Sequence, residues 1–102
     1  MTANEMLMKK YREWLQNMTK REWENIKVYA EAKKMSIPDY MMMCIEITER
    51  DYKQDAELRA DLWNMHAEKL LASNKHRQEH GHIDRFWLTK KGLNQFNAIY
   101  NE

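Results

Sequence analysis

Glycine and proline are scarce in this chain. Two glycines and one proline occur in 102 residues, while 43% of the residues are apolar and 32% are charged. Folds made of strands and turns need glycine and proline at their turns, so the composition argues against an all-β fold. Length and composition instead predict one globular domain, residues 1–102, that is mainly α: a compact bundle of about four or five helices.

Cysteine and long apolar runs are scarce as well. Cys44 has no second cysteine with which to pair, and this favours a reducing, cytoplasmic location. No apolar run is long enough to cross a bilayer, and no signal-peptide pattern opens the sequence. We therefore expect no membrane among the partners of this protein.

Motifs of catalysis are also missing. The sequence contains no Gly-rich phosphate loop, no nucleophile elbow, and no Ser/His/Asp or Cys/His arrangement. His76 and His80 lie one helical turn apart with His82 nearby, but a zinc site needs about four converging ligands and only Glu79 is close. We expect neither an enzyme nor a cofactor or metal site.

The net charge of +1 hides two segments of opposite charge. Residues 35–68 carry eight acidic and three basic side chains. Residues 69–91 carry six basic and two acidic side chains, together with three histidines. This asymmetry matters more for the choice of a binding partner than the net charge does.

Apolar residues recur at helical spacing near the start of the chain. They predict a first helix over residues 3–18. Its apolar stripe consists of Leu7, Tyr11, Trp14, Leu15 and Met18. Thr19 and Glu22 then form a capping-box pattern, which predicts a second helix over residues 20–34.

The middle of the chain contains further helix signals. The Ser-Ile-Pro-Asp segment that begins at Ser36 predicts a helix over residues 37–50. No glycine or second proline interrupts residues 38–72, which could form one long helix or two. We favour two, with Asp55 capping the second over residues 56–72.

The C-terminal part follows a different pattern. Residues 73–82 are polar, and the aromatic stretch over residues 83–88 favours a strand. Together they favour a small β-hairpin, a wing, near residues 75–88. Thr89 can then cap a last helix over residues 90–100.

Three methionines stand in a row within an almost wholly apolar segment. Successive helical residues point in different directions, so Met41, Met42 and Met43 cannot all face one core. The segment is either a central helix contacted on several sides or an oligomer interface. Because flexible thioethers suit adaptable interfaces, we predict a homodimer built on helix 37–50 through Met41 and Met42.

Two segments resemble DNA-binding regulators. Ala30, Met35, Ser36 and Tyr40 follow the rhythm of a helix-turn-helix pair, and they are also similar to the two helices of ribbon-helix-helix proteins. The pair departs from that pattern at Lys34, where a glycine is usual.

The second resemblance lies near the C-terminus. The segment from Leu88 to Gly92, Leu-Thr-Lys-Lys-Gly, resembles the last wing strand and the following helix of winged helix-turn-helix regulators. This resemblance implies a dimeric, non-enzymatic DNA-binding regulator that contacts the phosphate backbone through a basic wing. The implied nucleic-acid-binding residues are Lys69, Lys75, His76, Arg77, Arg85, Lys90 and Lys91.

The acidic segment supports an alternative hypothesis. The chain could be a small protein-binding inhibitor or adaptor of the mobile-element type, whose acidic helices face a basic partner such as a nucleic-acid-binding protein. Charge complementarity of this kind sets association rate and specificity. The predicted partner-binding residues are Met41, Met42, Glu46, Glu49, Asp51 and Asp55.

Overall fold

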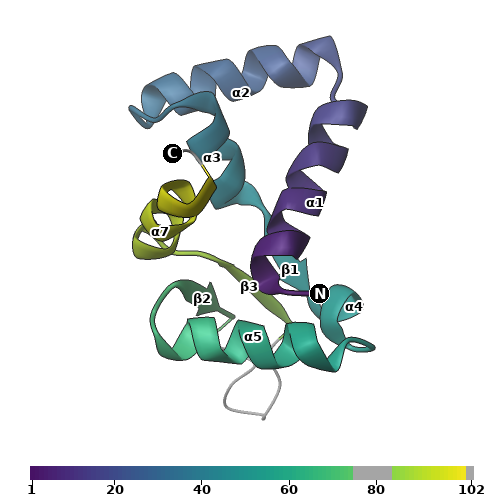
Figure 1. The fold of residues 1–102 in the computed structure, drawn as a ribbon. Coiled ribbons are helices and arrows are strands. Elements are labelled where there is room, and N and C mark those ends of the chain that lie inside the picture. The colour runs from purple at the N-terminus through teal and green to yellow at the C-terminus, as the bar shows by residue number, and fades with distance from the viewer. Residues whose placement is uncertain (75–83, 101–102) are drawn as a thin grey trace.

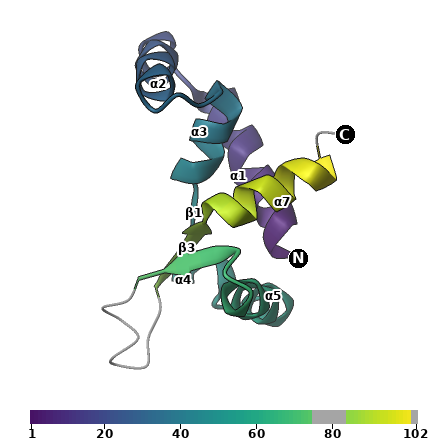
Figure 2. The same ribbon diagram turned by 90° about the vertical axis from the view of Figure 1, so that its left-hand side faces the viewer.

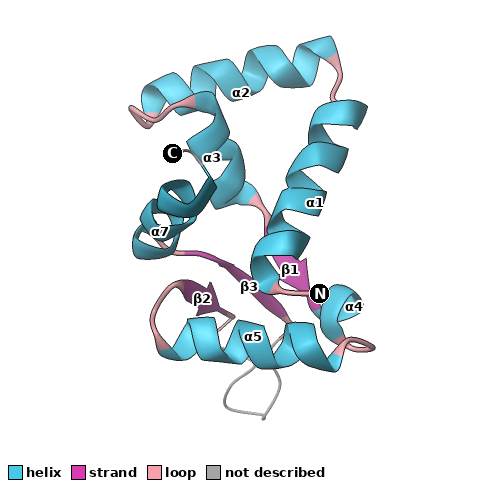
Figure 3. Cartoon of the chain, in the orientation of Figure 1, coloured by secondary structure: helices cyan, strands magenta, loops and turns pink. Residues whose placement is uncertain are grey.

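The computed structural model describes residues 1–74 and 84–100. This part is mainly helical, as predicted, with a small antiparallel sheet (Figure 3). The helices are α1 (Ala3–Asn17), α2 (Lys20–Ala32), α3 (Ile37–Cys44), α4 (Glu49–Tyr52), α5 (Ala56–Ala67) and α7 (Lys90–Tyr100) (Figure 1). The strands are β1 (Glu46–Thr48), β2 (Leu71–Ser73) and β3 (Arg85–Leu88). None of these helices has both the length and the apolar character required to span a bilayer.

Local capping signals start three helices where they were predicted. The side chains of Thr19, Ser36 and Asp55 each accept the backbone N–H three residues later, and so cap α2, α3 and α5. Glu22 has a different role from the one that the capping-box pattern predicted. Its carboxylate accepts a hydrogen bond from the Trp14 indole and ties the start of α2 to α1.

Two predicted helices are too long. The helix predicted over residues 37–50 ends at Cys44, and the one predicted over residues 56–72 ends at Ala67. Residues 46–48 and 71–73 form β1 and β2, which flank β3 in an antiparallel sheet of order β1-β3-β2, and residues 49–50 begin α4. Pairing with a strand far along the chain therefore overrides local helical preference at both places.

The predicted hairpin exists at its base. β2 runs antiparallel to β3 with Ser73 opposite Phe86, and Asn74 Nδ2 donates a 3.0 Å hydrogen bond to Asp84 Oδ1. The connection, residues 75–83, lies outside the described residues. β2 and β3 approach that connection beside α5, at the end of the molecule opposite α2 (Figures 1 and 2).

The core lies between the sheet and the helices α1, α3, α5 and α7. Alternation along each strand sends one set of side chains inward, so that Ile47, Phe86 and Leu88 are buried while Glu46 and Arg85 are exposed. The helices contribute the remaining large buried side chains, among them Leu7, Met42, Leu58, Leu62, Leu93 and Phe96.

The apolar helix α3 occupies a central position. It contacts α1, α2, α7 and β3, so the first interpretation of the methionine run, a helix contacted on several sides, is confirmed. Met41 and Met42 are buried, with 0% and 3% of their surface exposed, and Met43 packs partly against the core. Met41 and Met42 therefore cannot contact a second copy as predicted, because they are buried within the chain, and the homodimer stays a prediction.

Candidate nucleic-acid interface

The chain between β1 and β2 forms a short helical pair that was not predicted from the sequence. α4 and α5 follow one another between β1 and β2, with a connection at residues 53–55. Asp51 Oδ2 accepts the Thr48 N–H at 2.8 Å and starts α4, and Asp55 starts α5. The pair predicted from residues 20–34 and 37–50, α2 with α3, also packs together; α3 contacts β3, while α2 lies at the end of the molecule away from the hairpin (Figure 1).

The solvent-facing side of α5 carries a single carboxylate, Glu57, in its first turn. Leu58 and Leu62 are fully buried and hold the helix against the core. At 3.6 residues per turn, the exposed residues of the opposite side form one continuous face. These residues are Ala56, Arg59, Ala60, Trp63, Asn64 and Ala67, with Glu57 at the edge. We call them the α5 outer face.

The acidic residues of α5 and its cap contact the beginning of α1. The amino group of Met1 forms ion pairs with Asp55 at 3.3 Å and with Glu57 at 3.1 Å. The backbone N–H of Ala3 donates a 2.7 Å hydrogen bond to Asp61 Oδ2. The beginning of α1 thus contacts all three carboxylates, of which Glu57 remains exposed at the edge of the α5 outer face.

Trp63 is the largest side chain on the α5 outer face, and 45% of its surface is exposed. Its ring lies edge-on to Phe86 of β3 at 5.6 Å and to His66 at 5.7 Å between centroids. His66 Nε2 in turn forms a 2.9 Å hydrogen bond with Ser73 Oγ at the end of β2. These contacts give the indole a defined position beside the base of the hairpin.

Arg59 spans the connection between α4 and α5. Its Nη2 donates a 2.8 Å hydrogen bond to the Lys53 carbonyl. A guanidinium has five N–H donors, so this single bond orients the side chain and leaves other donors for a ligand. Both Arg59 and Lys53 are exposed.

Three of the predicted phosphate-binding cations gather where α5 ends and α7 begins. Lys69, Lys90 and Lys91 are all exposed. Thr89 Oγ1 donates a 2.7 Å hydrogen bond to the Lys69 carbonyl, which joins the two segments. Lys91 Nζ donates a 3.0 Å hydrogen bond to the Glu68 carbonyl and so places a positive charge at the C-terminus of α5, where the helix dipole is negative.

The remaining predicted cations do not share that position. Arg85 lies at the other end of β3, where it pairs with Glu46 at 3.4 Å and its guanidinium stands 5.8 Å from the centre of the Trp87 ring. Lys75, His76 and Arg77 lie outside the described residues. Within the described residues, the predicted cations lie in two separate places: Lys69, Lys90 and Lys91 in one, and Arg85 in the other. They form no continuous ribbon.

The carboxylates of the alternative hypothesis are largely used inside the chain. Glu46 pairs with Arg85, and Asp51 pairs with Lys10 at 2.8 Å. Burial raises the pKa of Asp51, but Lys10 and the Thr48 N–H more than offset this and hold that pKa below its ordinary value. Glu49 is exposed. An acidic surface built on these residues would present few free charges to a basic partner.

A local signal for the α4–α5 pair does exist in the sequence. Thr48 and Asp51 have the spacing of a capping box, three residues apart, and Asp55 follows with a second cap. Two helix starts so close together require a very short first helix. That spacing could have directed attention to Arg59, Trp63 and Asn64, which the sequence reading did not select.

The described residues contain no group of three or more His, Cys, Asp or Glu side chains placed to hold a metal ion, and His76, His80 and His82 lie outside them. The site therefore consists of the exposed face of one helix beside the base of a hairpin. Comparison of the chain with protein-family models, curated proteins and solved structures found no match.

Proposed function

We propose that the protein is a DNA-binding regulator of the winged-helix type, and that α5 is the helix that enters the major groove. The order of elements supports this proposal. A helical pair stands between the first and second strands, and the second and third strands form a hairpin beside the second helix. In helix-turn-helix proteins the second helix of such a pair reads the major groove.

The observation that carries the proposal is the composition of the α5 outer face. A helix fits the major groove, which is about 12 Å wide. A carboxylate on the entering face would be repelled by the phosphates, and the one carboxylate at the edge of this face, Glu57, is paired with the Met1 amino group. Its three alanines allow a close approach, and Arg59, Trp63 and Asn64 supply the larger contacts.

Each of these larger side chains suits a known contact with base edges. Arginine pairs with two acceptors of guanine, and asparagine pairs with the donor and acceptor of adenine. We assign these roles to Arg59 and Asn64. Trp63 presents an apolar surface suited to the thymine methyl group or to a sugar.

Cations at the two ends of α5 fit the phosphates that border the groove. Lys53 precedes the helix and Lys69 follows it, and both are exposed. The sequence adds Lys75 and Arg77 after β2. Phosphate contacts of this kind set the register of a protein on DNA without reading the sequence.

The cellular setting of the proposal is the cytoplasm. Cys44 is a free, exposed thiol, which suits a reducing compartment. The net charge of +1 provides little general attraction to DNA. Sequence-specific contacts of α5 must therefore provide much of the affinity.

The experiment is selection of bound duplexes from a random-sequence pool at low salt, followed by fluorescence anisotropy with the selected duplex. We expect Arg59→Ala and Trp63→Ala each to weaken binding about tenfold, the effect of losing one good base contact. Arg21→Ala is the matched control, because Arg21 is an exposed arginine on α2, which lies at the opposite end of the molecule (Figure 1). It should change the affinity less than about twofold.

Two results would contradict the proposal. One is failure of the protein to retain any duplex at low salt. The other is an equal loss of affinity in Arg59→Ala and Arg21→Ala, which would mean that the cations act only through total charge. Circular dichroism and thermal unfolding of each variant separate a binding defect from a folding defect.

A further inference from the structure

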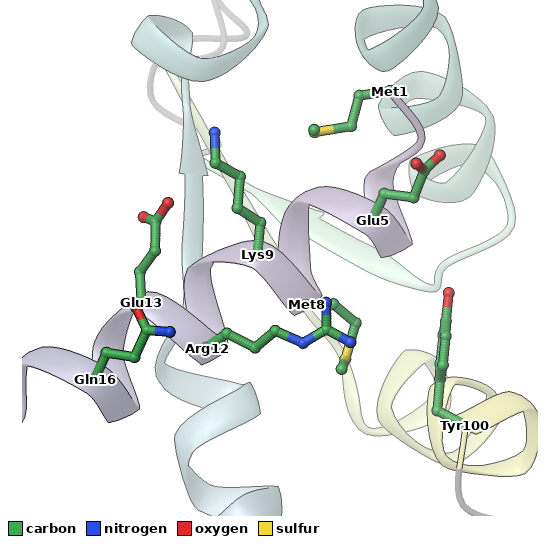
Figure 4. A pocket seen from close by; sticks show the side chains of 8 residues that line it. All are labelled: Met1, Glu5, Met8, Lys9, Arg12, Glu13, Gln16 and Tyr100. Carbon is green, nitrogen blue, oxygen red and sulfur yellow. The ribbon is translucent and has the colours of Figure 1, made fainter.

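Two of the hollows on the surface of the described chain are similar in volume but differ in what lines them. The first, about 430 Å³, runs along α1 with Tyr100 across from it (Figure 4). All of its other lining residues belong to α1 or precede it, and Lys9 and Glu13 extend away from Tyr100. Side chains of one helix that point apart cannot surround a ligand, so this hollow does not favour a small molecule.

The second hollow, about 390 Å³, lies where the end of α3 meets the sheet. Its lining consists of Met43 and Cys44 of α3, Glu46 of β1, and Arg85 and Trp87 of β3. Pockets that hold small molecules have volumes from about 300 Å³ upward and combine apolar side chains with a few polar groups. This hollow has the same combination, supplied by separate elements. We call it the sheet pocket.

Alternation along the strands explains why these side chains meet. Phe86 and Leu88 point into the core, so Arg85 and Trp87 point to the opposite side of the sheet. Glu46 of β1 lies directly opposite Trp87 in the antiparallel register. Directly opposite residues of an antiparallel pair share one face of the sheet, so the carboxylate, the guanidinium and the indole all lie on the side away from the core.

An exposed ion pair forms the polar part of the sheet pocket. Arg85 Nη1 lies 3.4 Å from Glu46 Oε2, and the two side chains are 47% and 43% exposed. Hydrogen bonds between a guanidinium and a carboxylate are usually about 2.7–2.9 Å long, so this pair is loosely joined. A guanidinium has five N–H donors and a carboxylate has two acceptor oxygens. Each partner therefore has further bonding capacity for a ligand of opposite charge.

Trp87 and Met43 form the apolar part. Both are half-buried, and the Arg85 guanidinium stands 5.8 Å from the centre of the Trp87 ring. These contacts hold the indole in place while part of it stays accessible. Aromatic rings pack favourably on one another, and a thioether sulfur packs favourably at a ring edge. A flat aromatic ring is therefore the apolar group that suits this lining.

The two charges decide which aromatic ligand fits. A ligand with only a carboxylate would be attracted by Arg85 and repelled by Glu46, and a ligand with only an ammonium group would meet the reverse. A zwitterion satisfies both side chains, since its carboxylate can bind the guanidinium while its ammonium group binds the carboxylate. An α-amino acid carries both charges on one carbon, beside its own side chain.

We propose that the sheet pocket binds a free aromatic α-amino acid. Its carboxylate pairs with Arg85, its ammonium group pairs with Glu46, and its ring packs against Trp87 and Met43. The pocket uses no residue of the α5 outer face. Binding of the amino acid can therefore be tested without DNA, and its failure would leave the proposed function standing.

Isothermal titration calorimetry with L-phenylalanine tests the ligand class. We expect one site per chain with a dissociation constant of about 1 mM or tighter, as for a ligand of this size. Three further ligands separate the contacts: phenylpropionate lacks the ammonium group, phenethylamine lacks the carboxylate, and L-leucine keeps both charges but lacks the ring. Each should bind at least about tenfold more weakly than L-phenylalanine, the effect of losing one charged contact or the ring contact.

Variants of the ion pair locate the site. Arg85→Gln and Glu46→Gln should each weaken L-phenylalanine binding about tenfold. Both variants should fold, because an exposed ion pair contributes little to stability. Arg50→Gln and Glu49→Gln are the matched controls, since both residues are exposed in the neighbouring helix α4 and neither lines the sheet pocket. They should bind as the wild type does.

NMR provides an independent readout. Of the four tryptophan indole N–H resonances, that of Trp87 should shift most on titration, and a Trp87→Phe variant assigns it. The inference is overturned by absence of saturable binding up to about 10 mM L-phenylalanine, or by L-leucine binding as tightly as L-phenylalanine. Equal loss of affinity in Arg85→Gln and Arg50→Gln, or a Trp87 resonance that does not move, would overturn it as well.

Discussion

Gly92 has no room for a side chain. A Cβ atom at this position would lie 2.0 Å from the Leu70 carbonyl oxygen, which belongs to the backbone. The neighbouring Thr89 explains this crowding, because its Oγ1 donates to the Lys69 and Leu70 carbonyls and accepts the Gly92 N–H. The Leu-Thr-x-x-Gly pattern thus joins the end of α5 to the start of α7.

We predict that Gly92→Ala destabilises the protein by about 3 kcal/mol, because either the Leu70 carbonyl or α7 must move to admit the methyl group. Urea unfolding measures this loss. Asn94→Ala is the matched control, since Asn94 is exposed in the same helix, and it should stay within about 0.5 kcal/mol of the wild type. Equal stability of the two variants would contradict the crowding argument.

At the scale of elements, α2 and α5 end in the same way. Lys34 and Lys69 adopt positive φ angles of 57° and 63°. In each case the next residue returns a hydrogen bond into the last helical turn, from Met35 N to the Ala30 carbonyl and from Leu70 N to the Met65 carbonyl, both at 2.9 Å. Glycine is the usual residue at such a helix end, so both lysines adopt a strained backbone conformation.

Lys34→Gly should therefore stabilise the protein by about 0.5–1 kcal/mol, because glycine adopts a positive φ without steric conflict. Lys33→Gly provides the control. Lys33 has a φ of −87° in the right-handed region. Glycine there only increases the freedom of the unfolded chain, so this variant should make the folded protein less stable. Thermal unfolding distinguishes the two, and a loss of stability in both variants would refute the prediction.

Over the whole molecule, carboxylates tie the first helix to the proposed DNA-binding part. Asp51 pairs with Lys10 of α1, and Asp55 pairs with the amino group of Met1. The Leu58 N–H and that amino group hold the pKa of Asp55 below its ordinary value. Lys10 and the Thr48 N–H do the same for the pKa of Asp51, against the opposing effect of burial.

These lowered pKa values predict acid sensitivity. A carboxylate whose pKa is lower in the folded state contributes its full stability above its unfolded pKa, which is about 4 for an aspartate such as Asp51. That stability is lost as the pH falls through the folded value. Urea midpoints should therefore decline below about pH 4. Asp51→Asn should be less stable at neutral pH and should lose less on acidification, and parallel curves for variant and wild type would disprove this account.

The sequence alone determined the features that depend on neighbours a few residues apart. Thr19, Ser36 and Asp55 start helices where their side chains can reach the next turn, and the predicted helices 3–18 and 90–100 agree with α1 and α7 within a residue. Such hydrogen bonds and apolar stripes are local, so their residues can be read directly.

Tertiary structure decided the strands and the exposed face of α5. β1 and β2 contain three residues each, too few for a periodic pattern, and they are strands because β3 lies between them. The sheet in turn buries Leu58 and Leu62 and leaves Arg59, Trp63 and Asn64 facing solvent. Long-range pairing and burial depend on residues distant in the chain, and no local spacing encodes them.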